Sequence, residues 1–395
     1  MKAKLNTIEL FSGAGGFALG FAEAGFKHEL LLDFNKDACN TIRKNKELKN
    51  KALAGCKLYE GDARDFDFSV IDRDVDVISG GPPCQPFSIG GNHKGYLDDR
   101  DMFPVAIKAI RQLRPKAFAF ENVQGLLRDN FADYLSYILL QLSHPDIAHK
   151  NEEVWTDHLS RLERSHTSGA QSDLTYNVVF RSLNASVYGV PQHRKRVFIV
   201  GFRGDLGHEW SFPEETHSMT SLLYSQWVSG DYWDEHEISK RMRPKLTKTQ
   251  KETVEKLKLD YCLFPPSEER CRTVRDAISD LPNPRTHKKL SRDHFNHEYR
   301  GGARSYAGHT GSDYDLPAKT LKAGVHGVPG GENMVRYKDG RIRYFTVRET
   351  ARLQTFPDDY FITGNWSEAM RQLGNAVPVR LGSVVANSIQ QQLSC

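Results

Sequence analysis

The sequence has few cysteines, no long apolar run and almost no excess of charge of one sign. Its six cysteines are scattered over 395 residues without a CxxC pair, which excludes a disulfide scaffold and a zinc site of that spacing. No run approaches the roughly 18 apolar residues that span a bilayer, and Glu9 interrupts the N-terminus before a signal-peptide core. We therefore expect a cytoplasmic protein without a membrane segment. The 54 basic and 50 acidic residues nearly cancel, so the positions of the charges are more informative than their sum.

Short apolar runs alternate with helical patterns through residues 1–125. Strands are predicted at 7–11, 28–34, 75–80 and 116–123, and helices at 17–25, 37–48 and 102–115. This alternation predicts right-handed strand–helix–strand units and an α/β fold with a mostly parallel sheet. The composition changes near residue 205, which predicts a first domain at 1–205, completed by 345–395, and a smaller second domain at 206–344. The polar stretch 143–176 is predicted to be a surface helical excursion without an assigned role.

A glycine-rich turn, FSGAGGF, follows the first predicted strand and precedes a helix. Glycines there let backbone N–H groups approach a ligand beside a helix N-terminus. The next strand ends at Asp33 and Phe34, where an acid suits a ribose diol and a ring suits an adenine face. Asp62 ends a third strand and is placed to reach an adenine edge. Together these turns favour an adenosine-containing cofactor of undetermined kind, with a tight turn that binds nothing as the alternative.

Cys84 stands directly after two prolines in GGPPCQPFS, at the carboxyl end of a predicted strand. The stiff backbone holds the thiol in the crevice where α/β sheets bind ligands. A free thiol has a pKa of about 8.5 and is mostly protonated near neutral pH, so a nucleophile here requires help from its surroundings. We interpret Cys84 as a candidate nucleophile, and the alternative is a small core residue. The other five cysteines are interpreted as packing or surface residues.

A carboxylate and a basic run lie beside two further apolar strands. Glu121 follows AFAF, and so apolar a setting favours a carboxyl group that gives or shares a proton. The alternative is a carboxylate that accepts backbone hydrogen bonds. The run QHRKR precedes the strand 197–202, and alternation places Gln192, Arg194 and Arg196 on one side. The guanidinium groups of the two arginines suit contact with a phosphate or a carbonyl oxygen, and they also suit pairing with the Glu121 carboxylate. The alternative is a solvated face.

Six motifs, taken in order, resemble those of the DNA (cytosine-5)-methyltransferase family. They are FSGAGGF, GGPPCQPFS, ENV, QHRKR, the helix TVRETARLQ and the turn GNAVP, and they extend over nearly the whole chain. PPCQPFS and RETARLQTFP are highly specific. Enzymes that methylate amino groups of DNA are similar in fold but have an aromatic residue where Cys84 stands. The resemblance therefore implies methylation of carbon and an S-adenosylmethionine-dependent, Rossmann-like fold.

The resemblance implies S-adenosyl-L-methionine as cofactor, S-adenosyl-L-homocysteine as product, and no metal. By that resemblance Asp33 binds the ribose, Phe34 lies against the adenine and Asp62 reaches its amino group. Asp33 departs from the glutamate that is usual in the family. The cofactor-binding residues implied are Phe11, Ser12, Gly13, Ala14, Gly16, Asp33, Phe34, Asp62, Ala63, Pro83, Met102, Asn375 and Val377.

The same resemblance assigns the chemistry. The target cytosine is flipped out of the duplex, because its ring cannot be reached inside the stack. Cys84 adds to C6 while Glu121 protonates or hydrogen-bonds N3, and loss of the C5 proton after methylation expels the cysteine. Arg196 holds the cytosine O2, and Arg194 holds a phosphate or the loop. The glycine-containing segment 88–101 is expected to close over the DNA.

The second domain is expected to recognise a specific sequence in duplex DNA. Residues 285–304 carry six Lys/Arg against two Asp/Glu, which suits phosphate contact, with solvated loops as the alternative. The predicted DNA-binding residues are Gln85, Ser88, Gln192, Arg285, Lys288, Lys289, Arg292, Arg300 and Arg304. We expect a monomeric modification enzyme of a prokaryotic restriction–modification system, associated with the nucleoid through DNA. A cognate restriction endonuclease, where one exists, is expected to form no obligatory complex with it.

Three other functions compete with this interpretation. An RNA cytosine methyltransferase of the same fold is the nearest, but members that act on transfer RNA tend to have a shorter second region. A catalytically inactive DNA-binding relative is disfavoured by the intact Cys84, Glu121 and Arg196. A nicotinamide oxidoreductase would use the glycine turn and Asp33 but leaves PPCQPFS without a role.

Overall fold

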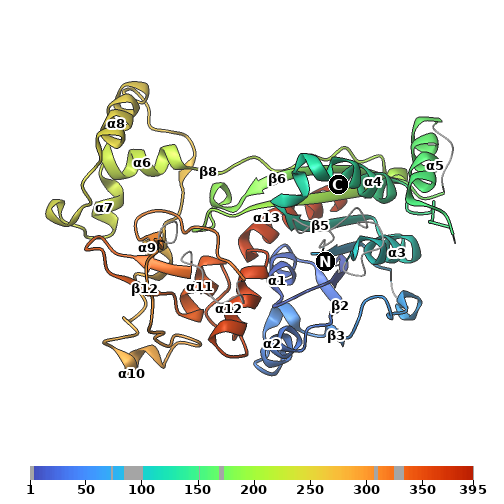
Figure 1. Ribbon diagram of the computed structural model, residues 1–395, viewed down its shortest axis with the longest axis horizontal. Coiled ribbons are helices and arrows are strands. Elements are labelled where there is room, and N and C mark those ends of the chain that lie inside the picture. Colours follow the sequence, from blue (N-terminus) through green and yellow to red (C-terminus); the bar gives the residue numbers. More distant parts are fainter. Residues whose placement is uncertain are drawn as a thin grey trace. The chain divides into compact units, whose positions relative to one another are not determined.

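The computed structural model describes residues 4–72, 74–83, 101–150, 152–168, 173–306, 310–323 and 333–394. By its internal contacts the chain divides into two compact units (Figure 1). Unit 1 comprises Met1–Leu183, Lys195–Pro213 and Gly382–Cys395, and unit 2 comprises Asn184–Arg194 and Glu214–Leu381. Residues 345–381 therefore belong to unit 2 by their contacts. The predicted division into a catalytic and cofactor-binding domain, 1–205 with 345–395, and a smaller target-recognition domain, 206–344, stays a prediction.

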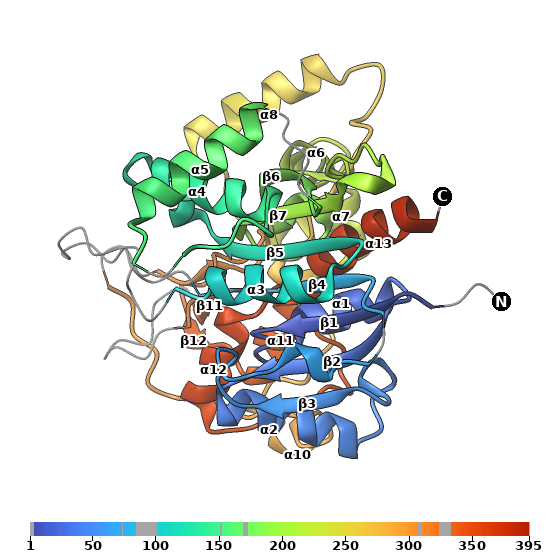
Figure 2. The same cartoon turned by 90° about the vertical axis from the view of Figure 1, so that its right-hand side faces the viewer.

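A seven-stranded sheet forms the centre of unit 1 (Figure 2). Its strands are β1 (Asn6–Leu10), β2 (Lys27–Asp33), β3 (Lys57–Glu60), β4 (Val77–Gly80), β5 (Ala117–Val123), β6 (Tyr176–Asn184) and β7 (Lys195–Arg203), in the order β3-β2-β1-β4-β5-β7-β6. The first five strands pair in parallel, and β7 is antiparallel to β5. The predicted α/β fold with a mostly parallel sheet is confirmed. The strand order reverses at β1 and β4, and ligands of such sheets bind outside the carboxyl ends of the strands at that point.

Helices lie between the strands of unit 1 and at its C-terminal end. They are α1 (Gly16–Glu23), α2 (Lys36–Glu47), α3 (Phe103–Leu113), α4 (Ala132–Ser143) and α5 (Trp155–Ser168), and α13 (Val379–Ser394) begins in unit 2 and continues in unit 1. Short 3₁₀ turns lie at Lys51–Leu53, Phe68–Val70, Gln124–Leu127, Asp129–Phe131, Ala185–Tyr188 and Gly204–Leu206. The predicted excursion 143–176 contains α5, so its helical character is confirmed.

Aromatic packing fixes the strand that carries the predicted acid. Phe118 and Phe120 of β5 are both buried, with ring centroids 5.3 Å apart, and Phe103 of α3 lies 6.4 Å from Phe120. A side chain at Gly201 of β7 would collide with the Phe118 ring, so glycine is required where the two strands meet. The apolar run AFAF thus places Glu121, the next residue, at the carboxyl edge of a rigid sheet.

Two buried ionisable side chains hold the helix that follows the glycine turn. His28 Nε2 on β2 lies 2.7 Å from the Ala18 carbonyl oxygen of α1. Glu9 on β1 accepts hydrogen bonds from the Ala18 N–H and from Ser79 Oγ, the latter at 3.3 Å. Burial lowers the pKa of His28 to about 4 and raises the pKa of Glu9 to about 8, with a small further contribution to Glu9 from Asp33. Both side chains are therefore neutral at intermediate pH.

The ionisation of Glu9 predicts an alkaline loss of stability. Because its pKa is higher in the folded chain than the ordinary 4.5, its contribution is complete below that value and is lost as pH rises toward about 8. Glu9→Gln keeps the shape and hydrogen-bonding oxygen but cannot ionise. Relative to this variant, we expect the wild-type free energy of unfolding to fall by about 1.4 kcal/mol per pH unit across that window. Urea unfolding at a series of pH values measures the difference, and parallel curves for the two proteins would rule out a buried, neutral Glu9.

Unit 2 combines short helices with very short strands. Its helices are α6 (Met219–Trp227), α7 (Asp231–Glu235), α8 (Lys248–Asp260), α9 (Val274–Ile278), α10 (Lys288–Ser291), α11 (Val347–Leu353) and α12 (Trp366–Asn375), with a 3₁₀ turn at Lys240–Met242. Its strands are β8 (His217–Ser218), β9 (Glu269–Arg270), β10 (Ser312–Asp313), β11 (Met334–Arg336) and β12 (Ile342–Tyr344), which form sheets β8-β9 and β10-β11-β12. One hydrophobic cluster surrounds Phe345 and Leu353, and another surrounds Tyr232 and Trp233. Among the helices that the structure describes, none has the length and apolar character to cross a bilayer.

Candidate active site

The glycine turn after β1 is built from left-handed backbone conformations. The φ angles are 57° at Phe11, 52° at Gly13 and 84° at Gly15, where α1 is capped. The Ser12 N–H donates to the Leu32 carbonyl oxygen at 3.0 Å, and the Gly15 N–H donates to the Ser12 carbonyl oxygen at 2.9 Å. A Cβ atom added at Gly13 would meet nothing within 4 Å, so the turn opens onto free space. The Ser12 hydroxyl oxygen is buried and has no hydrogen-bond partner among the described residues.

Asp33 at the end of β2 holds this turn in place. Its carboxylate accepts hydrogen bonds from the Gly13 N–H at 2.7 Å and from the Asn35 N–H at 2.8 Å. The side chain of the next residue, Phe34, is 70% exposed. The predicted acid therefore lies beside the predicted turn, and an aromatic face is open next to both. A role for the Asp33 carboxylate in fixing the turn's backbone is a feature that the sequence pattern did not predict.

The remaining predicted cofactor residues of unit 1 lie at neighbouring strand ends. Asp62 forms an ion pair with Arg64, with Nη2 and Oδ2 2.6 Å apart, and the hydrogen bonds from Arg64 lower the pKa of its carboxyl group. Ala63 is buried. The Met102 N–H donates to the Pro83 carbonyl oxygen at 3.1 Å, which links the start of α3 to the loop after β4.

Glu121 and Arg196 form an ion pair at the carboxyl edge of the sheet. The Arg196 Nε and Glu121 Oε1 atoms are 2.8 Å apart, and their side chains are only 13% and 9% exposed. Antiparallel pairing of β5 with β7 sets this contact, because it aligns Val123 with Arg196. The predicted contact between an arginine of QHRKR and Glu121 is present.

The loop that precedes Cys84 is fastened to the same edge. A Cβ atom at Gly81 would lie 3.6 Å from Glu121 Oε2, so the loop passes directly beside the carboxylate. Asn122 Nδ2 donates to the Pro82 carbonyl oxygen at 3.0 Å. Asn122 was not singled out by the sequence, although it is the central residue of ENV. Cys84 itself, with Gln85 and Ser88, lies outside the described residues.

The family model for C-5 cytosine-specific DNA methylases matches residues 5–146 and 156–391. The chain belongs to this family. It is a DNA (cytosine-5)-methyltransferase, as the order of its motifs predicted, and such methyltransferases use S-adenosylmethionine. The match extends through both units.

Curated relatives align over almost the whole chain. The type II methyltransferase M.AplI of Arthrospira platensis is 30% identical over 404 residues, covering 100% of this chain and 88% of that protein. M.Eco47II of Escherichia coli, also a type II methyltransferase, is 31% identical over 386 residues, covering 97% of this chain and 78% of that protein.

Solved structures share the fold. A DNA modification methyltransferase encoded within an E. coli prophage has a TM-score of 0.55 and 21% identity, covering 99% of this chain and 100% of that one. The Dnmt2 methyltransferase of S. pombe has a TM-score of 0.57 and 18% identity, with 99% of each chain covered. At these identities the likeness concerns the fold alone.

Two predicted site residues of the methyltransferase are buried inside unit 2. Arg194 is fully buried and donates to the carbonyl oxygens of Leu321 at 3.2 Å, Gly374 at 2.7 Å and Ala376 at 3.0 Å. Alternation along QHRKR is as predicted, because Gln192 is likewise buried while Lys195 is exposed. The structure thus places Arg194 on protein carbonyl groups rather than at the surface.

The side-chain amide of Gln192 is also engaged by protein groups. Its Nε2 donates to Gln354 Oε1 at 2.9 Å, and its Oε1 accepts from the Leu321 N–H at 2.9 Å. Gln354 is the glutamine of RETARLQ, for which the sequence suggested no partner. Of the two predicted cofactor residues in unit 2, Asn375 is exposed at the end of α12 and Val377 is buried.

All six predicted DNA-binding cations between 285 and 304 are exposed. They are Arg285, Lys288, Lys289, Arg292, Arg300 and Arg304. Exposed apolar side chains lie among them, with Leu290 56% exposed and Tyr299 40% exposed. Such a mixture of cations and apolar groups suits contact with a nucleic acid.

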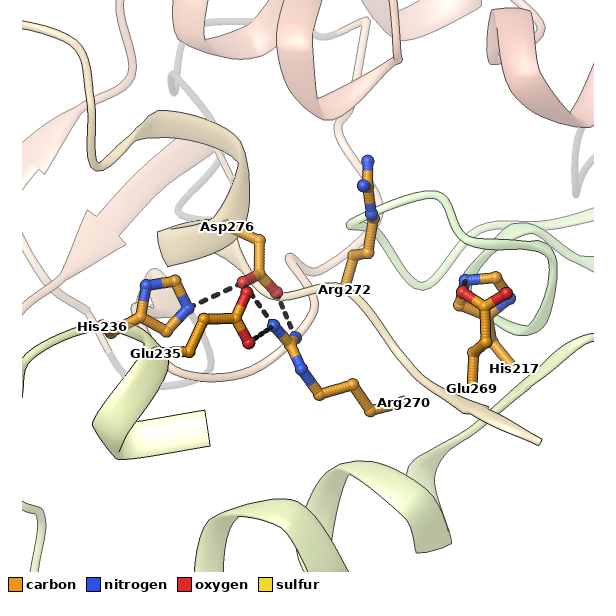
Figure 3. A pocket seen from close by; sticks show the side chains of 7 residues that line it. All are labelled: His217, Glu235, His236, Glu269, Arg270, Arg272 and Asp276. Carbon is orange, nitrogen blue, oxygen red and sulfur yellow. Dashed lines mark hydrogen bonds and ion pairs between the residues drawn. The ribbon is translucent and has the colours of Figure 1, made fainter. Parts of the chain in front are cut away.

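A polar pocket of about 420 Å³ in unit 2 brings together acids, histidines and arginines (Figure 3). Ligand atoms of Glu235, His236 and Asp276 lie within 4.8 Å of one another, as in a metal site. However, Arg270 forms ion pairs with the carboxylates of Glu235 and Asp276, each at 2.7 Å. His236 Nε2 also lies 2.7 Å from Asp276 Oδ1. A cation would have to displace Arg270, so we interpret this cluster as a structural link between α7, β9 and α9.

Proposed function

We propose that the enzyme methylates C5 of a flipped-out cytosine within a specific duplex DNA sequence, through a covalent bond between Cys84 and C6. The observation that carries this proposal is the buried Glu121–Arg196 pair beside Gly81, three residues before Cys84. The proposed proton donor, Glu121, and the cation Arg196 therefore lie where the loop that leads to Cys84 leaves the sheet. That arrangement suits addition of a thiolate to a ring that is protonated as it is attacked.

The chain's own residues account for the movement of protons and electrons. Cys84 forms a bond to C6 as a thiolate, while Glu121 gives or shares a proton at N3. The electron density displaced from the C5–C6 double bond is thereby stabilised on N3, and C5 becomes nucleophilic. Arg196 keeps Glu121 in place and holds the cytosine O2. Transfer of the C5 proton to a base after methylation restores the double bond between C5 and C6 as the bond from C6 to Cys84 breaks, and Cys84 leaves as a thiolate with the electron pair of that bond. Because these atoms are enclosed in a stacked duplex, the base must leave the helix first.

The glycine turn fits S-adenosyl-L-methionine. The unpartnered Ser12 hydroxyl oxygen, the open space at Gly13 and the exposed Phe34 ring offer a polar partner, room and a stacking face. When bound, this cofactor supplies an electrophilic methyl group and leaves as S-adenosyl-L-homocysteine. We propose that the turn 11–16 holds it, with Asp33 fixing the turn. The other predicted contacts are at Asp62, Ala63, Pro83, Met102, Asn375 and Val377, and no metal is required.

We further propose that residues 206–344 read the DNA target and that the exposed cations of 285–304 contact its phosphates. Gln85 and Ser88, which flank the nucleophile, remain proposed DNA contacts. Arg194, bonded to backbone carbonyl groups of unit 2, is proposed to hold the chain's own loop rather than a phosphate.

Relatives that are named type II methyltransferases support a proposal for the biological setting. We propose a monomeric modification enzyme of a restriction–modification system that acts on DNA in the cytoplasm. A cognate endonuclease, where present, would act separately on the same sequence.

Transfer of label from radioactive S-adenosylmethionine tests the reaction. With unmethylated duplex DNA, label is expected in 5-methylcytosine, and Cys84→Ser is expected to abolish it. Addition of a chelator should leave the rate unchanged. Label in RNA alone would show that the substrate is RNA and not DNA. Methyl transfer by the Cys84→Ser variant would show that Cys84 is not the nucleophile.

A further inference from the structure

A second basic region of unit 2 lies outside the predicted recognition segment. Residues 240–251 contain six Lys/Arg and no Asp/Glu, a denser positive charge than the six against two of 285–304. The segment runs from the 3₁₀ turn Lys240–Met242 into the first turn of α8. In both views α8 and α10, the latter within 285–304, lie at opposite ends of unit 2 (Figures 1 and 2). The two basic regions are therefore separate surfaces.

The cations of this segment have almost no counter-charge among the residues that the structure describes. Arg243 is paired with Asp234, its Nη2 and Oδ1 3.2 Å apart, and its guanidinium lies over the Trp233 ring. The other five form no ion pair with any described residue, and all five are exposed: Lys240, Arg241, Lys245, Lys248 and Lys251. Uncompensated like charges held this close repel one another, so their proximity raises the energy of the protein alone.

The fold keeps these side chains on the outside. Val254 and Leu257 are the buried residues of α8, which turns the opposite face of the helix to solvent. A capping box of Thr247 and Gln250 fixes where α8 begins. Its first turn contains no acid but holds Lys248 and Lys251. Cations are disfavoured at that end of a helix, so an external anion would relieve an arrangement that is unfavourable in the free protein.

We propose that the basic segment 240–251 binds the phosphate backbone of duplex DNA beyond the part read by the recognition segment. This inference rests on the proposed function, because it takes DNA as the substrate. Duplex DNA supplies a dense row of negative charges, and contacts to phosphates carry no sequence information directly. Gln250, the one amide in the segment, is already engaged in the capping box. The segment should therefore contribute affinity that depends on salt, and should leave the choice of target unchanged.

The triple variant Lys245→Gln, Lys248→Gln and Lys251→Gln tests this surface. A matched control, Lys51→Gln, Lys57→Gln and Lys150→Gln, removes the same charge from exposed positions of unit 1. Binding to an unmethylated duplex of mixed sequence is measured by fluorescence anisotropy over a range of salt concentrations. We expect the triple variant to bind roughly 10–100-fold more weakly at low salt, with a salt slope smaller by about 2–3. The control should behave as wild type, and the methylated sites should be unchanged.

Equal binding by the triple variant and the control would overturn the proposal. A weaker affinity with an unchanged salt slope would also contradict it, because the loss would then not come from phosphate contacts. In the same measurement with RNA, weaker binding by the triple variant to RNA but not to DNA would overturn the proposal and assign the surface to RNA. Because binding is measured without turnover, the affinities and salt slopes are independent of methyl transfer. Absence of methyl transfer by the wild type would refute the proposed function instead.

Discussion

Replacing Glu121 by glutamine is expected to lower kcat by about 10²–10⁴-fold, the range contributed by a positioned proton donor. The amide has nearly the shape of the carboxyl group, so it can occupy the same place beside Arg196, whose Nε atom lies 2.8 Å from Glu121 Oε1 in the wild type. It cannot transfer a proton to N3. Single-turnover rates with duplex DNA measure the change, and thermal unfolding shows whether unit 1 remains intact.

Glu153→Gln provides the matched control. Glu153 is likewise paired with an arginine of unit 1, since it accepts from Arg161 Nε at 2.6 Å, but it lies in the excursion that has no proposed role in the reaction. We expect this variant to methylate at the wild-type rate. A Glu121→Gln enzyme within about threefold of wild type would exclude proton transfer by Glu121, since general acid–base groups contribute far more than that.

Replacing Arg194 by alanine is expected to destabilise the protein by about 3 kcal/mol or more. The loss would leave the buried carbonyl oxygens of Leu321, Gly374 and Ala376 without the donor that now joins them. Hydrogen bonds from a charged donor are stronger than neutral ones, and unsatisfied buried acceptors add a desolvation penalty. Chemical denaturation gives the free energy of unfolding, with Lys195→Ala, an exposed neighbour, as the control.

The Arg194 variant also separates two roles that the sequence left open. A loop-holding role predicts a large loss of stability. A phosphate-binding role predicts normal stability with weaker DNA binding and a salt slope smaller by about one. The second outcome would contradict the buried position of this arginine.

Local patterns were sufficient to predict several strands and helices of unit 1, although α4 was not predicted. The predicted strands 7–11, 28–34 and 116–123 agree within a residue with β1, β2 and β5. Continuous apolar runs bounded by glycine or an acid are unambiguous in a buried parallel sheet. The sequence predicted that an arginine of QHRKR holds Glu121, and the antiparallel pairing of β5 with β7 makes that arginine Arg196.

Apart from the helix of RETARLQ, which is α11, unit 2 was predictable only as a change of composition. Strands of two or three residues, such as β8 and β10, carry no hydrophobic period. Its polar contacts join distant parts of the chain, as in the pairing of Gln192 with Gln354, 162 residues apart. Nothing near Gln192 in the sequence distinguishes a buried amide from one that faces DNA. Likewise, the position of Asp33 was predictable, but its bond to the Gly13 N–H depends on how the turn folds back.

The covalent step at Cys84 is tested most directly with duplex DNA that contains 5-fluorocytosine. Fluorine at C5 cannot leave as the proton does, so the bond between Cys84 and C6 should persist once the methyl group has been transferred. With S-adenosylmethionine present, mass spectrometry should show protein joined to methylated DNA after denaturation, and Cys84→Ser should give no such species. Methylation of ordinary DNA with no adduct on the fluorinated duplex would contradict a covalent intermediate at Cys84.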